Sequence, residues 1–477
     1  MSNMNKSIAP YIIEQCKHYQ VIPLNDDSHT LTIAVADIDS KRDAQLGFAL
    51  ERKINTVVWT ISKFQQEFTH LMLRSTNHIN SNMLLSTPEQ LSAIELVNQL
   101  LLSAIKQRAS DIHFEPYQHE YRVRFRIDGV LHIVKSIKSE NSMQIVTRLK
   151  IMAQLDIAER RLPQDGQLNF NVDNQNWAMR LSTLPVTDGE KIVLRIIQQT
   201  KQQIDIQQLG LNQSDLKRYQ ATLHLPQGLI LVCGPTGSGK TMTLYSGLNE
   251  LNQPQRNICS VEDPIEISLP GINQTQINVK SGLTFSHVLR AFLRQDPDVL
   301  MVGEIRDKET AQIAIQAAHT GHLVLSTLHT NSSSEAILRL QQMGIASYLL
   351  ASGLKLVISQ RLLRLLCPSC KKIASQPLPI TDLANCDHFE ANGCPQCIGG
   401  YYGRIGIYEL LPITPPIQQQ LLTQAIISIP TINQLAIKQG MISLYQSGIN
   451  LVKQGKTSFT ELSRVVGINQ LTTMETM

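Results

Sequence analysis

One segment constrains this chain more than any other: residues 234–241, which read Gly-Pro-Thr-Gly-Ser-Gly-Lys-Thr. The segment directly follows Gly228–Cys233, an apolar run of the length expected for a buried strand. The residues after Thr241 have the composition of a helix. A strand, a glycine-rich loop and a helix in this order can bind phosphate, because glycines let backbone amides at the helix N-terminus converge on its oxygens. The segment therefore predicts an ATP-binding α/β core.

Every residue of this loop is a candidate for nucleotide binding: Gly234, Pro235, Thr236, Gly237, Ser238, Gly239, Lys240 and Thr241. Lys240 is expected to reach the β- and γ-phosphates of ATP, and the Thr241 hydroxyl to bind Mg²⁺. The alternative, a glycine-rich turn without a ligand, is a poor explanation of a full eight-residue match between a strand and a helix.

Acidic residues follow two other apolar runs. Asp298–Glu304 is an apolar strand that ends in a carboxylate, and ligands of parallel sheets bind at such strand ends. Glu304 is therefore a candidate to polarise the attacking water or to hold Mg²⁺ through water. Glu262, Asp263 and Glu266 crowd three carboxylates into one short stretch, which favours either a solvated loop or a segment that faces a cation.

Two histidines, His322 and His329, bracket the apolar run Leu323–Leu328. Residues seven positions apart fall on opposite faces of an ideal strand. We therefore expect the two histidines to mark the two ends of the strand.

Four cysteines form two Cys-x-x-Cys pairs, Cys367 with Cys370 and Cys394 with Cys397. Two such turns can place four thiolates around a structural Zn²⁺. The alternative, a redox-active pair, needs only one Cys-x-x-Cys in a thioredoxin-like context. The other cysteines are expected to be core thiols: Cys16, Cys233, Cys259 and Cys386.

Composition narrows the class of protein. A length of 477 residues predicts two to four domains, and 43 basic against 39 acidic side chains do not indicate a generally basic nucleic-acid surface. The most apolar long segment, residues 346–366, contains Lys355, Arg361 and Arg364 and is predicted to be a buried helix rather than a membrane span. No signal peptide is recognisable at the N-terminus, so we expect a cytoplasmic protein.

Polar stretches predict the domain boundaries. Alternating strand and helix signals beyond residue 214 favour a parallel sheet with crossover helices. The predicted order is a small α/β partner-binding domain at 1–70, a linker at 71–88, a second domain at 89–200, a linker at 201–214, and an ATPase domain at 215–477 that includes the cysteine segment 367–397.

Several motifs occur together in this order: 109–116, 124–129, 162–166, 234–241, 260–266, 294–307 and 320–331. With these motifs the chain, from about residue 90 to 470, resembles the secretion ATPases that power type II secretion and type IV pilus assembly. The phosphate loop alone is shared by many unrelated proteins, whereas the set of motifs is specific.

The resemblance implies a RecA-like P-loop ATPase core preceded by smaller α/β (PAS-like) N-terminal domains, with a zinc-binding insertion and a helical C-terminal region. It implies a homohexamer in which arginines of the preceding domain, here Arg180 and Arg195, approach the phosphates. By the same resemblance Glu304 is the catalytic base. Glu262, Asp263 and Glu266 form the acidic box of the family, and His322 and His329 its histidine box.

The function implied is that of a cytoplasmic motor that hydrolyses ATP with Mg²⁺ to assemble type IV pili or type II secretion pseudopili. It would work through an inner-membrane platform protein, with peripheral association to the bacterial inner membrane and no direct nucleic-acid contact. The cysteine quartet favours assembly over retraction. Two alternatives are a RecA-like nucleic-acid motor and a nucleotide-gated scaffold with little turnover. Nucleic-acid-stimulated hydrolysis would favour the first, and intact Lys240, Thr241 and Glu304 argue against the second.

Overall fold

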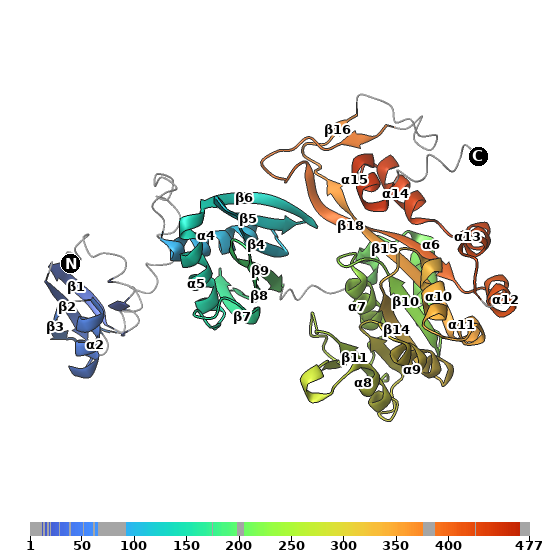
Figure 1. Cartoon of the computed structure of the whole chain (residues 1–477), viewed down its shortest axis with the longest axis horizontal. Coiled ribbons are helices and arrows are strands. Elements are labelled where there is room, and N and C mark those ends of the chain that lie inside the picture. Colours follow the sequence, from blue (N-terminus) through green and yellow to red (C-terminus); the bar gives the residue numbers. More distant parts are fainter. Residues whose placement is uncertain are drawn as a thin grey trace. The chain divides into compact units, whose positions relative to one another are not determined.

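The chain, seen in a computed structural model (Figure 1), forms two compact units, residues 1–92 and 93–477. The second unit is described throughout, apart from residues 174, 198–204, 375–386, 425 and 468–477. In the first unit the described residues are 12, 15–16, 19, 21–27, 29–37, 40–50, 52–60, 63–64 and 92. The predicted linker at 71–88, residues 201–204 of the second predicted linker, and Cys386 lie outside the described residues.

The first unit contains a three-stranded sheet and a helix. Its elements are β1 (Ile22–Asp27), β2 (Thr30–Val35), α2 (Ser40–Leu50) and β3 (Lys53–Val58). β1 is antiparallel to β2, whereas β3 is parallel to it, and a parallel pair needs the crossover that α2 provides. Leu31, Ile33 and Val35 alternate along β2 and share a core with Leu46 of the helix.

The second unit begins with a six-stranded antiparallel sheet in the order β6-β5-β4-β9-β8-β7. Its elements are α4 (Ala93–Lys106), β4 (Asp111–Pro116), β5 (Glu120–Ile127), β6 (Val130–Lys138), α5 (Ser142–Met152), β7 (Gln164–Val172), β8 (Gln175–Val186) and β9 (Gly189–Ile197). Burial alternates along β5, where Tyr121, Val123 and Phe125 are fully buried. This is the pattern of a sheet with one face on a core.

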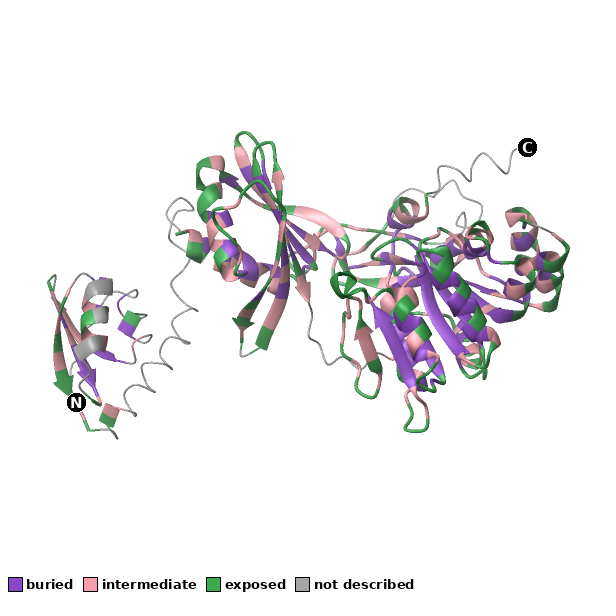
Figure 2. Cartoon of the chain, turned by 60° about the horizontal axis from the view of Figure 1, so that its bottom comes forward, coloured by how far each residue is buried: buried purple, intermediate pink, exposed green. Residues whose placement is uncertain are grey.

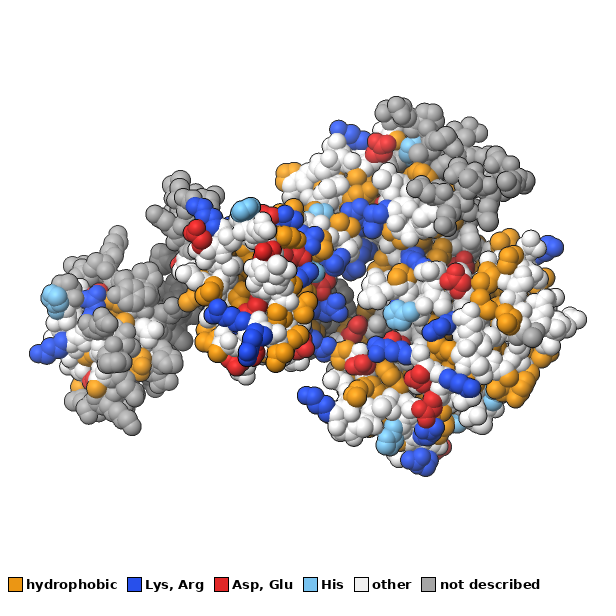
Figure 3. Space-filling model, viewed as in Figure 1, with side chains coloured by type: hydrophobic (Ala, Val, Ile, Leu, Met, Phe, Trp, Pro, Cys, Tyr) orange, Lys and Arg blue, Asp and Glu red, His pale blue; other side chains and the backbone are white. Residues whose placement is uncertain are grey.

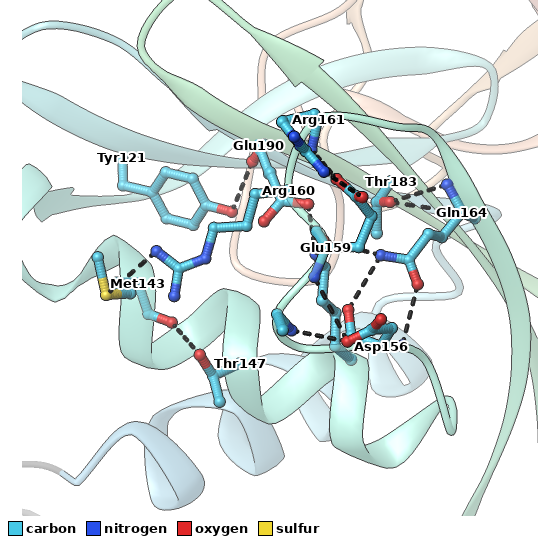
Figure 4. A network of polar contacts seen from close by, with 12 residues as sticks. Tyr121, Met143, Thr147, Asp156, Glu159, Arg160, Arg161, Gln164, Thr183 and Glu190 are labelled. Atoms are coloured by element: carbon cyan, nitrogen blue, oxygen red, sulfur yellow. Dashed lines mark hydrogen bonds and ion pairs between the residues drawn. The ribbon is translucent and has the colours of Figure 1, made fainter.

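Side-chain hydrogen bonds hold the loop that leads into β7 (Figure 4). Gln164 Nε2 donates to the carbonyl oxygens of Asp156 and Glu159, both at 3.0 Å. The backbone amide of Gln164 donates to Thr183 Oγ1 at 3.1 Å. Gln164 belongs to the 162–166 motif, so the glutamine of that motif acts structurally, by fixing the loop to β8.

A seven-stranded sheet follows, in the order β12-β11-β13-β14-β10-β15-β18. Its strands are β10 (Gly228–Cys233), β11 (Ile258–Glu262), β12 (Asn273–Gln276), β13 (Val299–Val302), β14 (Leu323–Leu328), β15 (Leu354–Leu366) and β18 (Tyr401–Pro412). All neighbouring pairs are parallel except β15 with β18. The predicted parallel sheet is therefore confirmed, with one antiparallel edge strand.

Helices cover both faces of this sheet. They are α6 (Gln213–Leu223), α7 (Lys240–Leu251), α8 (Phe285–Phe292), α9 (Lys308–His319), α10 (Ser333–Gln342), α11 (Ser347–Gly353), α12 (Pro415–Thr423), α13 (Ile429–Lys438), α14 (Leu444–Lys453) and α15 (Phe459–Val466). β10 shows the two layers directly, because Leu229, Leu231 and Cys233 enter one core while Ile230 and Val232 enter the other. Figure 2 shows the resulting concentration of buried residues in the central strands.

The prediction of a buried helix over residues 346–366 is wrong. Helix α11 ends at Gly353, and the 13 residues from Leu354 to Leu366 form β15. A strand that lies between two others, with helices on both faces, is apolar almost throughout, and periodicity does not separate such a run from a buried helix.

No described helix combines the length and the apolar composition needed to cross a bilayer. Acidic and basic side chains are interspersed on the face shown in Figure 3, in keeping with a net charge of +4.

Candidate functional site

The phosphate loop lies at the carboxyl edge of the parallel sheet, between β10 and α7. Gly234, Gly237 and Gly239 have φ angles of 151°, 80° and 88°, which side-chain-bearing residues rarely adopt. A Cβ atom at Gly234 would also lie 2.6 Å from the carbonyl oxygen of Gln360 on β15. The glycine at 234 is therefore required both by its backbone angles and by the strand behind the loop.

Lys240 is the first residue of α7, and its side chain folds back over the loop. Its Nζ donates to the carbonyl oxygens of Gly234 at 2.8 Å and Pro235 at 3.1 Å. Burial lowers the pKa of Lys240, and the negative charges of Glu304 and Glu266 act in the opposite direction. The loop lysine and two predicted acidic residues therefore share one site.

Thr241 lies beside Glu266, the last carboxylate of the acidic segment. Burial raises the pKa of Glu266, while the charges of Arg195 and Arg180 and a hydrogen bond with the Thr241 side chain act to lower it. The predicted Mg²⁺ ligand thus has a carboxylate as its neighbour, and two arginine charges act on that carboxylate.

Glu262 has a different environment. Its side chain is buried, and it accepts hydrogen bonds from Ser260 Oγ at 2.7 Å, from Gln274 Nε2 at 3.0 Å, and from the Tyr245 hydroxyl of α7. Every one of these partners belongs to the protein, so the carboxylate ties β11 to α7. These contacts support a structural role for Glu262 in holding the helix of the phosphate loop in place, and its catalytic role stays a prediction.

Glu304 lies two residues beyond β13 and is brought together with His329, which directly follows β14. Glu304 Oε2 is 3.5 Å from His329 Nε2, and Glu304 Oε1 is 2.5 Å from Arg306 Nη2. Burial lowers the pKa of His329, the charge of Lys240 lowers it further, and the charge of Glu304 opposes both effects. Lys240, Glu304 and His329 thus form one cluster at the carboxyl edge of the sheet.

His322 lies at the other end of β14. The parallel register pairs Leu328 with Cys233, next to the phosphate loop, and Leu323 with Gly228, at the opposite edge. His322 Nδ1 is within hydrogen-bond distance of the Ala317 carbonyl, at 3.1 Å. The two histidines do mark the two ends of the strand, as the spacing predicted. The structure places His322 at the edge of the sheet opposite the phosphate loop of its own chain, and its catalytic role stays a prediction.

Arg180 and Arg195 lie directly opposite each other on β8 and β9. Asp111 pairs with Arg195 at 3.0 Å, and its second oxygen is 3.6 Å from Arg126 Nε. Arg180 Nε is buried, with no hydrogen-bond partner among the described atoms. Two guanidinium groups thus share the Asp111 carboxylate, and Arg180 lies opposite Arg195 with no acidic partner for its Nε among the described residues. Like charges placed opposite each other on a sheet are unfavourable without further anions. The cluster has the chemistry of a binding surface for a polyanion.

The four predicted zinc ligands lie together: Cys367, Cys370, Cys394 and Cys397. All four Sγ atoms are within 4.8 Å of one another, and Sγ–Sγ distances of 3.8, 3.7 and 3.6 Å join three of the pairs. A tetrahedron with Zn–S bonds of about 2.3 Å has edges of about 3.8 Å. The short strands β16 (Lys372–Ile373) and β17 (Phe389–Glu390) pair between the two knuckles. The donor set and its spacing fit zinc, whereas a disulfide needs a far shorter sulfur separation.

Sequence reasoning missed three residues that support the phosphate loop or its acidic partners: Tyr245, Gln360 and Arg306. Gln360 and Arg361 interrupt an otherwise apolar run, and this signal was available. A helix over this run, which the sequence predicts, would not direct these residues at the loop, whereas the strand β15 does so for Gln360. Tyr245 gave no signal, since a tyrosine in a buried helix is ordinary.

Family models and related proteins match most of the chain. A family model described as Type II/IV secretion system protein matches residues 87–464, and a MshEN domain model matches residues 13–78. The chain is 46% identical over 464 residues to the protein transport protein HofB homolog of Escherichia coli, with 96% of this chain and 98% of that protein covered. It is 47% identical over 396 residues to the type IV pilus assembly ATPase PilB of Pseudomonas aeruginosa, covering 80% and 70%. It is 39% identical over 495 residues to the type II secretion system protein E of Pectobacterium carotovorum, covering 96% and 97%.

Solved structures resemble the chain as well. The ATPase DotB of Legionella pneumophila superimposes with a TM-score of 0.60 at 19% identity, over 80% of this chain and 97% of that one, which shows the fold alone. The pilus retraction motor PilT, solved with bound ADP, gives a TM-score of 0.52 at 27% identity, over 77% and 96%.

Proposed function

Because the chain belongs to the family of type II/IV secretion system proteins, we propose that it is a hexameric motor ATPase that assembles type IV pili or type II secretion pseudopili. Relatives that bear those names, a type IV pilus assembly ATPase and a type II secretion system protein E, are 47% and 39% identical to it. Membership of this family is what favours a secretion motor over a nucleic-acid motor with a similar core.

The observation that carries the proposal is the meeting of Lys240, Glu304 and His329 at the carboxyl edge of the sheet. Lys240 and the loop amides would bind the β- and γ-phosphates. Thr241 would hold Mg²⁺, whose charge offsets that of the phosphates, with Glu266 beside it. Glu304 would accept a hydrogen bond from the attacking water and orient it in line with the γ-phosphate, and His329 would keep that carboxylate in place.

Arg180 and Arg195 would complete the site from the antiparallel sheet. Their excess positive charge over Asp111 matches the charge that develops on a transferring phosphate. Because they stand on a different sheet from the phosphate loop, bound nucleotide would draw the two sheets together, and its hydrolysis would release them. This supports a motor rather than a static scaffold.

The client would be a pilin or pseudopilin fibre, reached through an inner-membrane platform protein with which the motor would associate on the cytoplasmic face. The first unit, matched by the MshEN model, would make a separate contact with a partner.

The decisive variant for the ATPase is Glu304→Gln, compared with Lys240→Ala. Glu304→Gln removes the group that orients water and should lower kcat about 10²-fold or more while ADP still binds. Arg180→Ala or Arg195→Ala should behave in the same way, whereas Lys240→Ala should lose binding. The measurements are phosphate release and ADP calorimetry on the purified full-length protein.

Glu309→Gln is the matched control, because Glu309 is half-exposed and pairs only with the exposed Arg290. Its turnover should equal that of the wild type. Unchanged phosphate release by Glu304→Gln would exclude Glu304 as the water-orienting residue.

We further propose that the cysteine quartet holds one structural Zn²⁺. The ion would cross-link the two knuckles and so fix the segment between β15 and β18, a role that needs no open coordination position. Metal analysis of protein purified without chelators should find about one zinc per chain. The Cys370→Ser and Cys397→Ser pair of substitutions should remove it. A zinc-free wild type in which all four thiols react with a thiol reagent would contradict the assignment.

A further inference from the structure

The strand behind the phosphate loop carries a buried polar side chain, that of Gln360, directly against the loop. Gln360 lies on β15, one residue beyond the point where Ser359 pairs with Cys233 of β10, and its side chain is only 2% exposed. The register therefore places Gln360 against Gly234, where the loop begins. A buried amide costs free energy unless its oxygen and its nitrogen are both hydrogen-bonded.

The oxygen of the Gln360 side-chain amide is hydrogen-bonded near the far end of the same loop. Its Oε1 accepts a hydrogen bond of 2.7 Å from Thr243 Oγ1, in the first turn of α7. Its Nε2 lies 2.9 Å from the position that a Cβ would take at Gly239, the residue that caps α7. No larger residue fits at Gly239 while Gln360 stands there.

The backbone of Gln360 contacts the start of the loop. Its carbonyl oxygen is 2.6 Å from the Cβ position of Gly234 and accepts a 2.9 Å hydrogen bond from the Arg361 guanidinium. One residue thus touches the first glycine of the loop through its backbone and the last through its side chain. The separation of these two ends determines how closely the loop amides can converge on phosphate.

The hydrogen-bond chain continues past Gln360. Nε2 of Gln360 donates to the Tyr408 hydroxyl at 3.5 Å, and this hydroxyl donates to the carbonyl oxygen of Leu209 at 2.7 Å. Between Thr243 and Leu209, each group accepts a hydrogen bond from the group before it and donates to the group after it. This order fixes which atom of the Gln360 side-chain amide faces Thr243. Leu209 ends the short 3₁₀ helix Ile206–Leu209, which precedes the ATPase sheet.

We propose that Gln360 is a positioning residue that holds the phosphate loop open to nucleotide from behind, acting through Thr243 and the loop ends. The proposal rests on the nucleotide-binding function proposed above and adds to it a residue outside the recognised motifs. Gln360 touches no reacting group. Its loss should therefore weaken binding of substrate and transition state alike, which raises KM and leaves kcat nearly unchanged.

The test uses the full-length protein, with ADP binding measured by calorimetry and ATP turnover by phosphate release. Gln360→Met keeps the length of the side chain but removes both hydrogen bonds, and Thr243→Val removes the same bond from the other side. Each should weaken ADP binding about tenfold and raise KM for ATP to a similar extent, with kcat within about threefold of the wild type. Because the two residues share one bond, the double variant should bind no more weakly than the weaker single variant.

Ser359→Ala is the matched control. Ser359 is fully buried one position earlier, donates to the Asn331 carbonyl at 3.2 Å and also contacts Cys233, directly before the loop. The variant therefore loses buried hydrogen bonds beside the loop but leaves the bond between Gln360 and Thr243 intact. Its ADP affinity should equal that of the wild type.

The outcomes separate the two proposals. Wild-type protein that binds no ADP would refute the proposed function itself. Wild type that binds ADP, together with Gln360→Met of equal affinity, would refute only the positioning role, and so would additive effects in the double variant. If Gln360→Met does not fold, Thr243→Val decides the question alone.

Discussion

Glu262 and Glu266 show how two carboxylates four residues apart acquire different chemistry. Glu262 is enclosed by Ser260, Tyr245 and Gln274, and each hydrogen bond it accepts comes from the protein. Glu266 faces the Thr241 hydroxyl, and burial raises its pKa. The Glu262 carboxylate therefore supports the structure, whereas the Glu266 carboxylate remains available beside Thr241, the predicted Mg²⁺ ligand. Residue type alone did not distinguish them.

His329 and His322, at the two ends of β14, allow a paired mutational test. His329→Ala removes the partner of Glu304 and should lower kcat about 10²-fold, whereas His322→Ala should keep kcat within about threefold because His322 lies at the opposite edge of the sheet. The measurement is steady-state phosphate release by both variants. Equal losses in the two would show that the position along β14 does not decide the role.

The lowered pKa of His329 predicts that ATP turnover depends on pH. Burial and Lys240 hold this pKa below its ordinary value, so the imidazole is neutral at pH 7 and gains a proton only under more acidic conditions than a free histidine does. If neutral His329 is the active form, wild-type turnover should fall only as the pH drops through the lowered pKa of His329, which lies below the ordinary histidine value of about 6.5. The His329→Ala variant should lack this acid limb.

At the scale of elements, one carboxylate fixes the C-terminal helices to the sheet. The Glu461 side chain, on α15, is fully buried and accepts hydrogen bonds from Arg364 Nη2 of β15 at 2.8 Å and from Arg464 Nη2 at 2.7 Å. Burial alone would raise the pKa of Glu461, but the hydrogen bonds from Arg464 and Arg364 outweigh burial and hold the pKa below its ordinary value.

Glu461→Gln should destabilise the docking of α15 by about 3 kcal/mol, since it leaves the Arg364 charge without its carboxylate. Because the folded-state pKa is depressed, the stabilisation is fully present above the unfolded pKa of about 4.3 and is lost as the pH falls through the folded value. The stabilisation by Glu461 is thus present at pH 7 in the wild type and lost in the variant. Hydrogen exchange of the backbone amides of residues 459–466 should be faster in the variant at pH 7.

Arg464→Gln is the control for that experiment. The Arg464 side chain is 49% exposed, so its loss should cost less than about 1 kcal/mol. Equal acceleration of exchange in the two variants would mean that the buried pair does not hold the helix.

The same elements show what the sequence could predict. β10, β14 and the start of α7 were located closely, because short apolar runs flanked by glycines or histidines leave little freedom for strand ends. The sequence placed Glu304 at a strand end and His329 at the end of another strand, but their contact at 3.5 Å depends on the order of β13 and β14 in the sheet, which the sequence did not predict. β15 was missed because its burial on both faces removes the alternation that identifies a strand. Gln360 was lost with it, since its role depends on register with β10 rather than on any local pattern.

For the whole molecule, the proposed active site draws on two sheets of different construction. The parallel sheet supplies the phosphate loop and the carboxyl-edge cluster, and the antiparallel sheet supplies Arg126 and Arg195 beside Asp111, with Arg180 opposite Arg195. Parallel sheets gather ligand groups at one edge, whereas an antiparallel strand displays side chains along its length. The parallel sheet thus contributes groups at one edge, and the antiparallel sheet contributes side chains along its strands.

The length of β15 has a mechanical consequence. Only its first half pairs with β10, through Ser359, whereas β18 accompanies it to Leu366. Beyond Gln360 the two strands leave the sheet as a twisted ribbon that carries the cysteine quartet, and Leu363 and Ile407 anchor α14 and α15 on it. From Gln360 to Cys367 the ribbon extends about 23 Å at roughly 3.3 Å per residue. A tilt of a few degrees at the phosphate loop would therefore displace the cysteine knuckles by more than an ångström, because the ribbon extends any rotation at its base over that length.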